Sequence, residues 1–134
     1  MKIFCSHAWT GEDVQRMTSL MTLATQSLEA NGHQVFCSVF DDEITQLNRA
    51  GDMKGIFTRA FKELIESDAL IVIIASPRRS VGQIMEFGLV FGENKPIYLF
   101  EHQSAAGSSY LPELSSKSYV WATADELISQ LREI

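Results

Sequence analysis

One carboxylate, Glu86, stands in a segment where a charged side chain is out of place. Burying a carboxylate without a partner is costly. Glu86 is therefore expected to pair with a basic residue, to face an open cleft, or to have a raised pKa, and a carboxylate does chemistry under the last two conditions. Its neighbours predict a helix that is apolar on nearly all sides: Ile84, Met85, Phe87, Leu89, Val90 and Phe91.

The residues just before Glu86 have the types that bind a phosphate or a ribose. Ser80 can cap the helix, and Gly82 allows a ligand to approach its N-terminus. Arg78 and Arg79 can add charge-assisted hydrogen bonds to a phosphate. Each residue also has an ordinary explanation, namely solvated arginines, a simple cap and relief of helix crowding. Together, and with Ser76, they predict a substrate-binding loop.

Several common chemical motifs do not occur in the sequence. The eight glycines form neither G-x-G-x-x-G nor a P-loop, and no cysteine or histidine pair has zinc spacing. No G-x-S-x-G elbow is present, and the three histidines are scattered. We therefore expect no metal site and no metal or organic cofactor.

The elements that must position these residues alternate along the chain. We predict strands at 2–5, 34–40, 69–75, 97–100 and 119–121 and helices at 14–28, 57–65, 80–93 and 124–131. Thr10 and Asp13 resemble a capping box for the first helix, and Asn31-Gly32 a stop for it. The polar residues 41–52 show no periodicity and are expected to form a long loop.

This alternation predicts an α/β fold, a three-layer flavodoxin-like or Rossmann-like domain with a five-stranded parallel sheet in the order 2-1-3-4-5. In that order the first and third strands are neighbours, and the loops after Cys5 and Ala75 should face one crevice. We therefore count Cys5, Ser6 and His7 among the substrate-binding residues. Cys5 and Cys37 are also expected to be free thiols of the core.

Composition limits the function classes. The chain has 134 residues, a mass of 15.0 kDa and 46% apolar residues, which predicts one domain over residues 1–134. A net charge of -6 and a pI near 5.0 argue against binding to a nucleic acid polymer or an anionic membrane. The longest apolar run, 69–75, cannot span a bilayer, and 1–5 lacks a signal-peptide core, so a cytoplasmic protein is expected.

Five short motifs are shared with one known family: Phe4-Cys5-Ser6-His7, Gly32-His33-Gln34-Val35-Phe36, Ser67-Asp68-Ala69, Ser80-x-Gly82-x-x-x-Glu86-x-Gly88 and Lys95-Pro96. Through them the chain resembles the nucleoside 2-deoxyribosyltransferase-like superfamily over nearly its whole length. The resemblance implies cleavage of an N-glycosidic bond, with Glu86 attacking the anomeric carbon of a nucleoside or nucleotide and the sugar passing to a base or to water. It assigns Ser80 and Gly82 to the sugar or its 5′ group, and Ser6 and His7 to the opposite wall.

The resemblance also implies a homodimer or higher homo-oligomer in which a neighbouring subunit completes the pocket. Tyr110, Trp121 and the 41–52 segment could contribute to it. Two positions depart from the family pattern. Ala60 stands where an aspartate is common, and Arg79 stands where transferases often have an acid. Arg79 would suit a 5′-phosphate, so nucleotide hydrolysis is as consistent with the sequence as nucleoside transfer.

Two alternatives stay open at this point. Ser6-His7 followed by Gly11-Glu12-Asp13 also resembles Toll/interleukin-receptor-type domains, some of which cleave NAD, although their usual Trp-Cys pair is missing after Ser80. A non-catalytic nucleotide-binding or interaction module is the other. In such a module Glu86 should be paired with an arginine or lysine, whereas an active Glu86 should lie in an open cleft beside Ser80 and Ser6.

Overall fold

Five parallel strands form one sheet at the centre of the molecule. The computed structural model describes residues 1–134. The strand order is β2-β1-β3-β4-β5, and each neighbouring pair is parallel. The predicted α/β class and strand order are confirmed. The strands are β1 (Lys2–Ser6), β2 (Gln34–Phe36), β3 (Ala69–Ile74), β4 (Ile97–His102) and β5 (Lys117–Trp121).

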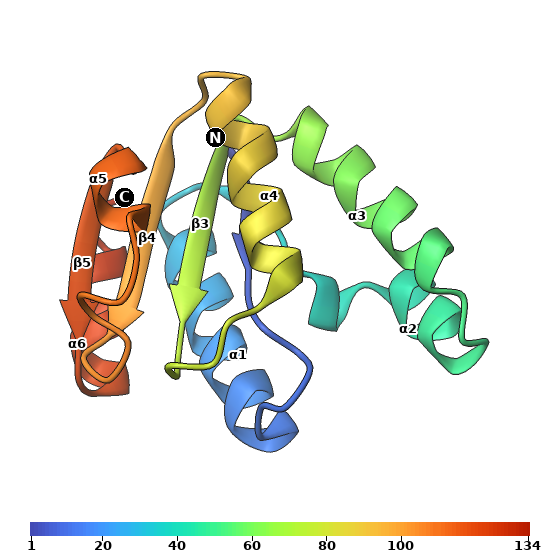
Figure 1. Cartoon of the computed structure of the whole chain (residues 1–134), viewed down its shortest axis with the longest axis horizontal. Coiled ribbons are helices and arrows are strands. Elements are labelled where there is room, and N and C mark those ends of the chain that lie inside the picture. The colour runs from blue at the N-terminus through green and yellow to red at the C-terminus, as the bar shows by residue number, and fades with distance from the viewer.

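Helices cover both faces of this sheet (Figure 1). One hydrophobic cluster lies under α1 and α6 and includes Met21 and Leu127. A second lies under α3 and α4 and includes Leu64 and Phe87. Because side chains alternate along a strand, successive residues of each strand feed the two clusters in turn. The four helices are α1 (Val14–Ala30), α3 (Met53–Glu66), α4 (Val81–Gly92) and α6 (Ala124–Leu131).

The first helix begins at Val14, and of the two predicted capping residues only Asp13 caps it. Asp13 is itself the N-cap, and its carboxylate accepts a hydrogen bond from the Arg16 backbone N–H at 2.9 Å. Thr10 lies in a turn before it, because Gly11 at φ 79° redirects the chain between the two residues. The predicted stop is confirmed: α1 ends at Ala30, and Gly32 follows at φ 88°.

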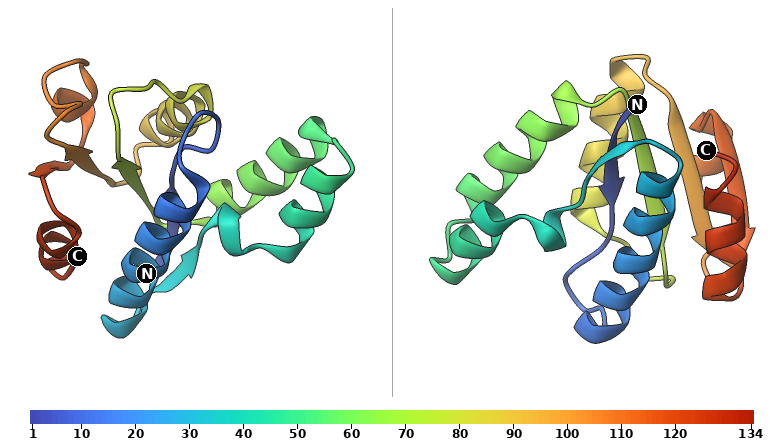
Figure 2. Two further views of the ribbon diagram at one scale, coloured as in Figure 1. Left: turned by 90° about the horizontal axis from the view of Figure 1, so that it is seen from below. Right: turned by 180° about the vertical axis from the view of Figure 1, so that it is seen from behind.

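The segment after β2 differs most from the prediction. Strand β2 ends at Phe36, and residues 38–40 form the 3₁₀ turn η1 (Ser38–Phe40). The expected loop contains a helix, α2 (Asp42–Arg49), capped by Asp41, which accepts from the Ile44 N–H at 3.0 Å. Only Ile44 of α2 is buried, so the helix carries no repeating apolar pattern. Figure 2 shows α2 and α3 extending away from the sheet.

The last third of the chain follows the prediction with small extensions. Strand β4 continues to His102 and β5 begins at Lys117, while α6 has the predicted bounds. A short helix, α5 (Leu111–Leu114), was not predicted. None of the helices is long and apolar enough to cross a membrane.

Candidate active site

Glu86 lies in the second turn of α4 and faces the end of the sheet. It is 9% exposed, and its Oε1 accepts a hydrogen bond from the Ser6 hydroxyl at 2.8 Å. Ser6 is the last residue of β1, and the Ser80 Oγ caps α4 by accepting from the Gln83 N–H at 3.2 Å. The structure therefore joins the end of β1 to Glu86, 80 residues away in the sequence.

Gln83 holds α4 against the strand ends, a role that the sequence reasoning missed. Its Nε2 donates to the Ile73 carbonyl at 2.9 Å and to the Ser6 carbonyl at 3.4 Å. Gln83 is buried and lies one turn before Glu86 on the same helix face. The sequence signal for this role is a polar residue three positions before Glu86 in an otherwise apolar helix. Its contacts fix the position of Glu86 relative to Ser6.

No arginine or lysine forms an ion pair with Glu86. Burial raises its pKa to about 7, against the opposing effects of the Ser6 hydrogen bond and the nearby His7. The ion pairs of the molecule involve Lys2, Arg59 and Lys95 instead. Glu86 thus lacks the arginine or lysine partner that a structural buried carboxylate requires. At neutral pH it is divided between its acid and base forms.

The loops after β1 and β3 meet, as the strand order predicts. The Ser76 hydroxyl donates to the Glu12 carboxylate at 2.6 Å, and the Arg78 guanidinium lies against Gly11. The Arg79 Nη2 donates to the Ser108 carbonyl at 3.3 Å. These contacts bring Arg78 and Arg79 to the carboxyl edge of the sheet, and neither forms an ion pair with a carboxylate.

A third cation, Arg16, was not predicted to belong to this edge. Its Nη2 donates to the Ala75 carbonyl at 3.4 Å, at the end of β3. Its only sequence signal is its place in the first turn of the helix that follows β1. Arg16, Arg78 and Arg79 together make this edge locally basic in a chain with net charge -6.

Gly82 leaves room beside the N-terminus of α4. A Cβ added there would come no closer than 3.9 Å to its nearest neighbours, Phe57 and the Ser80 hydroxyl. An alanine would therefore fit the free protein without displacing any neighbour. The packing of the chain itself gives no reason for a glycine at this position.

His7 and Cys5 lie on the other side of the sheet from Glu86. The His7 ring is 7% exposed, its Nδ1 lies 3.1 Å from the Ala8 carbonyl, and it packs on Trp9 at 5.0 Å between ring centroids. Cys5 is 1% exposed and packs in the cluster under α1. Of the three predicted residues after or at the end of β1, only Ser6 has a side chain that bonds to Glu86. The Cys5 side chain belongs to the core.

Ala60 provides no carboxylate to the site. It is 7% exposed and packs in the hydrophobic cluster under α3 and α4. No group of three or more His, Cys, Asp or Glu side chains is arranged to hold a metal ion. The polar groups of the site are therefore Glu86, Ser6, Gln83 and the basic edge of Arg16, Arg78 and Arg79.

A comparison of the chain with models of known protein families found a match. The family model of nucleoside 2-deoxyribosyltransferase matches residues 4–114. The chain belongs to this family. The match covers every residue of the candidate site, from Ser6 to Glu86. A search of curated proteins found no match.

Solved structures with the same fold come from several bacteria. A conserved protein of Enterococcus faecalis V583 superposes with a TM-score of 0.70 at 14% identity, covering 98% of this chain and 97% of that one. The CMP N-glycosidase of Clostridium botulinum gives 0.68 at 16% identity, with 98% and 97% covered. A 2-deoxyribosyltransferase from Bacillus psychrosaccharolyticus gives 0.61 at 17% identity, with 98% and 96% covered. The family and the fold point to a glycosyltransferase or N-glycosidase.

Proposed function

We propose that this protein cleaves the N-glycosidic bond of a nucleoside or nucleoside 5′-monophosphate, with Glu86 as the nucleophile. The observation that carries the proposal is a buried carboxylate with a hydroxyl donor and no arginine or lysine partner, at the carboxyl edge of a sheet of this family. Membership of the family favours this activity over the NAD hydrolysis of Toll/interleukin-receptor-type domains. The lack of a basic partner for Glu86 favours it over a non-catalytic module.

In the first step the ionised Glu86 attacks C1′ of the sugar. An ester bond forms between the Glu86 oxygen and C1′, and the bond from C1′ to the base nitrogen breaks. The electron pair of that bond leaves with the base, which takes up a proton from solvent. In the second step water or an acceptor base attacks C1′, gives up a proton to solvent and releases Glu86 as a carboxylate. The Ser6 hydroxyl orients one Glu86 oxygen, so that the other is free to react.

The basic edge supports a substrate with a 5′-phosphate. Arg78 and Arg79 form no ion pair, and guanidinium groups bind phosphate oxygens with strong charge-assisted hydrogen bonds. The N-terminus of α4 adds free backbone N–H groups beside Gly82. The C. botulinum relative of similar fold is a CMP N-glycosidase. We therefore place nucleotide hydrolysis ahead of transfer between nucleosides.

We also propose that two copies associate through the outer face of α4. Val81, Ile84, Met85 and Phe91 are 71%, 47%, 46% and 51% exposed on this helix. Apolar residues on the outer face of a helix call for a covering partner. Trp121 is 2% exposed and bonds to the Phe100 carbonyl, so it is not available to a partner's pocket, whereas Tyr110 is 79% exposed. Light scattering should give a dimer for wild type and a monomer for Met85→Lys.

Release of free base tests the proposed reaction. Wild-type protein is incubated with deoxynucleosides, nucleoside 5′-monophosphates and NAD, each with and without an acceptor base, and the products are separated by chromatography. We expect base release from monophosphates, with little dependence on the acceptor, and none from Glu86→Gln. Release that requires an acceptor would identify a transferase, and release from NAD alone an NAD hydrolase. Equal rates for wild type and Glu86→Gln would contradict the role of Glu86.

A further inference from the structure

Two thiols lie side by side on the face of the sheet opposite Glu86. The register of β1 and β2 pairs Ile3 with Val35 and Phe4 with Phe36, so the next pair is Cys5 and Cys37. Cys37 is still extended, at φ -138° and ψ 123°. Adjacent strands lie about 4.8 Å apart, within the range of Cα separations of roughly 4.4 to 6.8 Å that a disulfide bridges.

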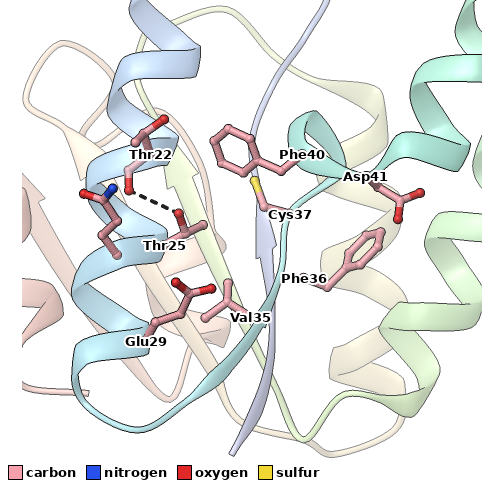
Figure 3. A pocket seen from close by; sticks show the side chains of 9 residues that line it. Thr22, Thr25, Glu29, Val35, Phe36, Cys37, Phe40 and Asp41 are labelled. Atoms are coloured by element: carbon pink, nitrogen blue, oxygen red, sulfur yellow. Dashed lines mark hydrogen bonds between the residues drawn. The ribbon is translucent and has the colours of Figure 1, made fainter.

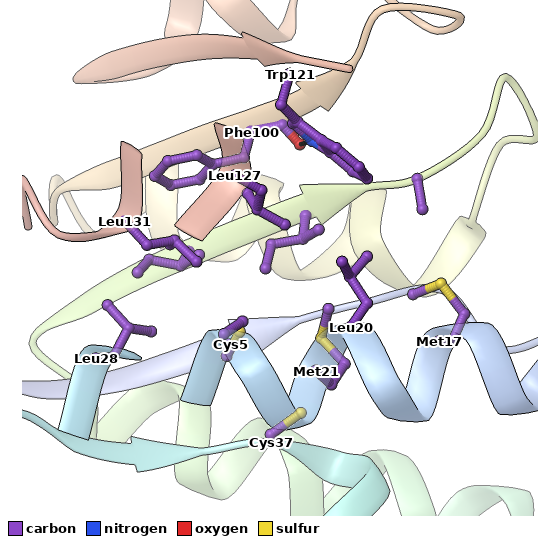
Figure 4. Close-up of a cluster of buried hydrophobic side chains, with 14 of the residues drawn as sticks. Cys5, Met17, Leu20, Met21, Leu28, Cys37, Phe100, Trp121, Leu127 and Leu131 are labelled. Atoms are coloured by element: carbon purple, nitrogen blue, oxygen red, sulfur yellow. Dashed lines mark hydrogen bonds between the residues drawn. The ribbon is translucent and has the colours of Figure 1, made fainter. Parts of the chain in front are cut away.

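Both cysteines are free and face the same core. Cys5 is 1% and Cys37 5% exposed, and both belong to the hydrophobic cluster under α1. Figure 4 shows Cys5 on β1 and Cys37 directly after β2, both beside that helix. Their side chains are therefore on the same side of the sheet, which a disulfide between adjacent strands requires.

The His7 side chain interacts with this pair of thiols. It lies on the same side of the sheet, two residues after Cys5, and its Nε2 is buried without a hydrogen-bond partner. Interactions with Cys5 and with His7 lower the pKa of Cys37 to about 5, although burial opposes the shift. Burial by itself would lower the pKa of His7, but Cys37 raises it above its usual value. Cys37 is therefore the more acidic of the two thiols, and His7 beside it stabilises its thiolate form.

A cavity leads from the surface to Cys37. It has a volume of about 450 Å³ and lies between α1 and the segment from β2 to Asp41. Figure 3 shows the Cys37 sulfur next to the Phe40 ring. The cavity is on the α1 side and does not include Glu86 or Ser6. A small oxidant can therefore reach Cys37 while Cys5 stays behind it.

We propose that Cys37 and Cys5 form an oxidisable thiol pair, which a hydroperoxide converts to a disulfide that switches off the site of Ser6 and Glu86. The Cys37 thiolate attacks one oxygen of the hydroperoxide, and the O–O bond breaks. The product is a sulfenic acid on Cys37, and the alkoxide or hydroxide that leaves takes the proton of His7. The Cys5 thiol then attacks the Cys37 sulfur, the S–S bond forms, and water leaves with the Cys5 proton.

The disulfide acts on Glu86 through the backbone. Ser6 follows Cys5 directly, and its hydroxyl is the only hydrogen-bond donor to Glu86. Closing the disulfide turns the Cys5 side chain toward Cys37, and the accompanying shift of the β1 backbone moves the Ser6 hydroxyl away from Glu86. The loss of activity rests on the proposed function, whereas formation of the disulfide does not.

The test treats reduced protein with one equivalent of hydrogen peroxide. Remaining thiols are alkylated, the protein is digested without reductant, and the peptides are identified by mass spectrometry. We expect a linked peptide that contains Cys5 and Cys37, and a loss of base release of about tenfold or more, the size of a lost hydrogen bond to a charged group. Dithiothreitol should reverse both. If the protein releases no base in either state, the linked peptide still decides whether the thiol pair exists.

Two variants separate the steps. In Cys5→Ser, Cys37 should stop at the sulfenic acid, which dimedone labels. In Cys37→Ser, Cys5 should stay reduced. As a measurement that needs no variant, the thiols of the folded wild type should react with peroxide faster than those of the same chain in urea. A folded protein whose Cys37 stays reduced, or whose thiols react no faster than in urea, would overturn the thiol pair. A disulfide that leaves base release unchanged would overturn the switch.

Discussion

Two carboxylates, Glu86 and Glu101, are buried on the same face of the sheet, and their surroundings differ. Glu86 is 9% and Glu101 3% exposed, and burial raises the pKa of both. Glu86 accepts a hydrogen bond from Ser6 and lies near His7, whereas Glu101 at the end of β4 forms no side-chain hydrogen bond or ion pair. Neither carboxylate contributes to the pKa shift of the other. Burial alone thus raises a pKa, and only Glu86 also has a hydrogen-bond donor that fixes the orientation of its carboxylate.

The largest difference between the two should appear in activity. Glu86→Gln removes the proposed nucleophile and should lower the rate of base release by about 10³-fold or more. Glu101→Gln makes the same chemical change outside the site and should leave the rate nearly unchanged. Steady-state kinetics on both variants measures this. A similar loss in both would mean that Glu101 belongs to the same site.

The pH dependence of stability should also distinguish Glu86. Its pKa rises on folding from 4.5 to about 7, so between these pH values the folded chain holds a proton that the unfolded chain releases. The free energy of unfolding should therefore fall as pH rises from 4.5 to 7, by about 3 kcal/mol, and then level off. Urea unfolding at several pH values measures this contribution as the difference between wild type and Glu86→Gln. The charges of His7 and Cys37 contribute to the pKa of Glu86, so this difference includes the coupling among the three groups. Curves that stay parallel from pH 4.5 to 8 would contradict the raised pKa.

Ser6→Ala should remove the contact that distinguishes Glu86 from Glu101. A hydrogen bond to a charged group contributes about 1.5 to 3 kcal/mol, so the rate should fall by roughly 10- to 100-fold. The Ser6 hydroxyl holds the pKa of Glu86 down, and without it the acid limb of the profile of kcat/KM against pH should move to higher pH. Ser6→Thr keeps the hydroxyl and is the matched control. An unmoved acid limb in Ser6→Ala would assign that limb to another group.

The smallest effect is expected at Gly82. Gly82→Ala fits the free protein and should raise the stability of α4 by up to about 1 kcal/mol. The added methyl group should nevertheless hinder a substrate that approaches the N-terminus of the helix, and KM should rise. Thermal unfolding and kinetics on one sample separate the two effects. An unchanged KM would place the substrate away from Gly82.

The sequence predicted the main residues of the candidate site but not the residues that hold them in position. An apolar helix with a single carboxylate pointed to Glu86, and the capping serine and glycine pointed to its N-terminus. Gln83 and Arg16 were missed because each acts through a contact with the end of a distant strand. The helix α2 was missed because it buries only Ile44 and has no apolar repeat.

The pattern of apolar and polar residues determined the fold of this protein, because alternating strand and helix periods leave few ways to cover a parallel sheet. It also placed a carboxylate, Glu86, in a helix that is mostly apolar. Only the tertiary structure decided which group stabilises this buried carboxylate, since the Ser6 hydroxyl reaches Glu86 across 80 residues and no arginine or lysine does. It likewise decided that His7 and Cys5 face Cys37 rather than the site, because alternate residues of a strand point to opposite faces of the sheet.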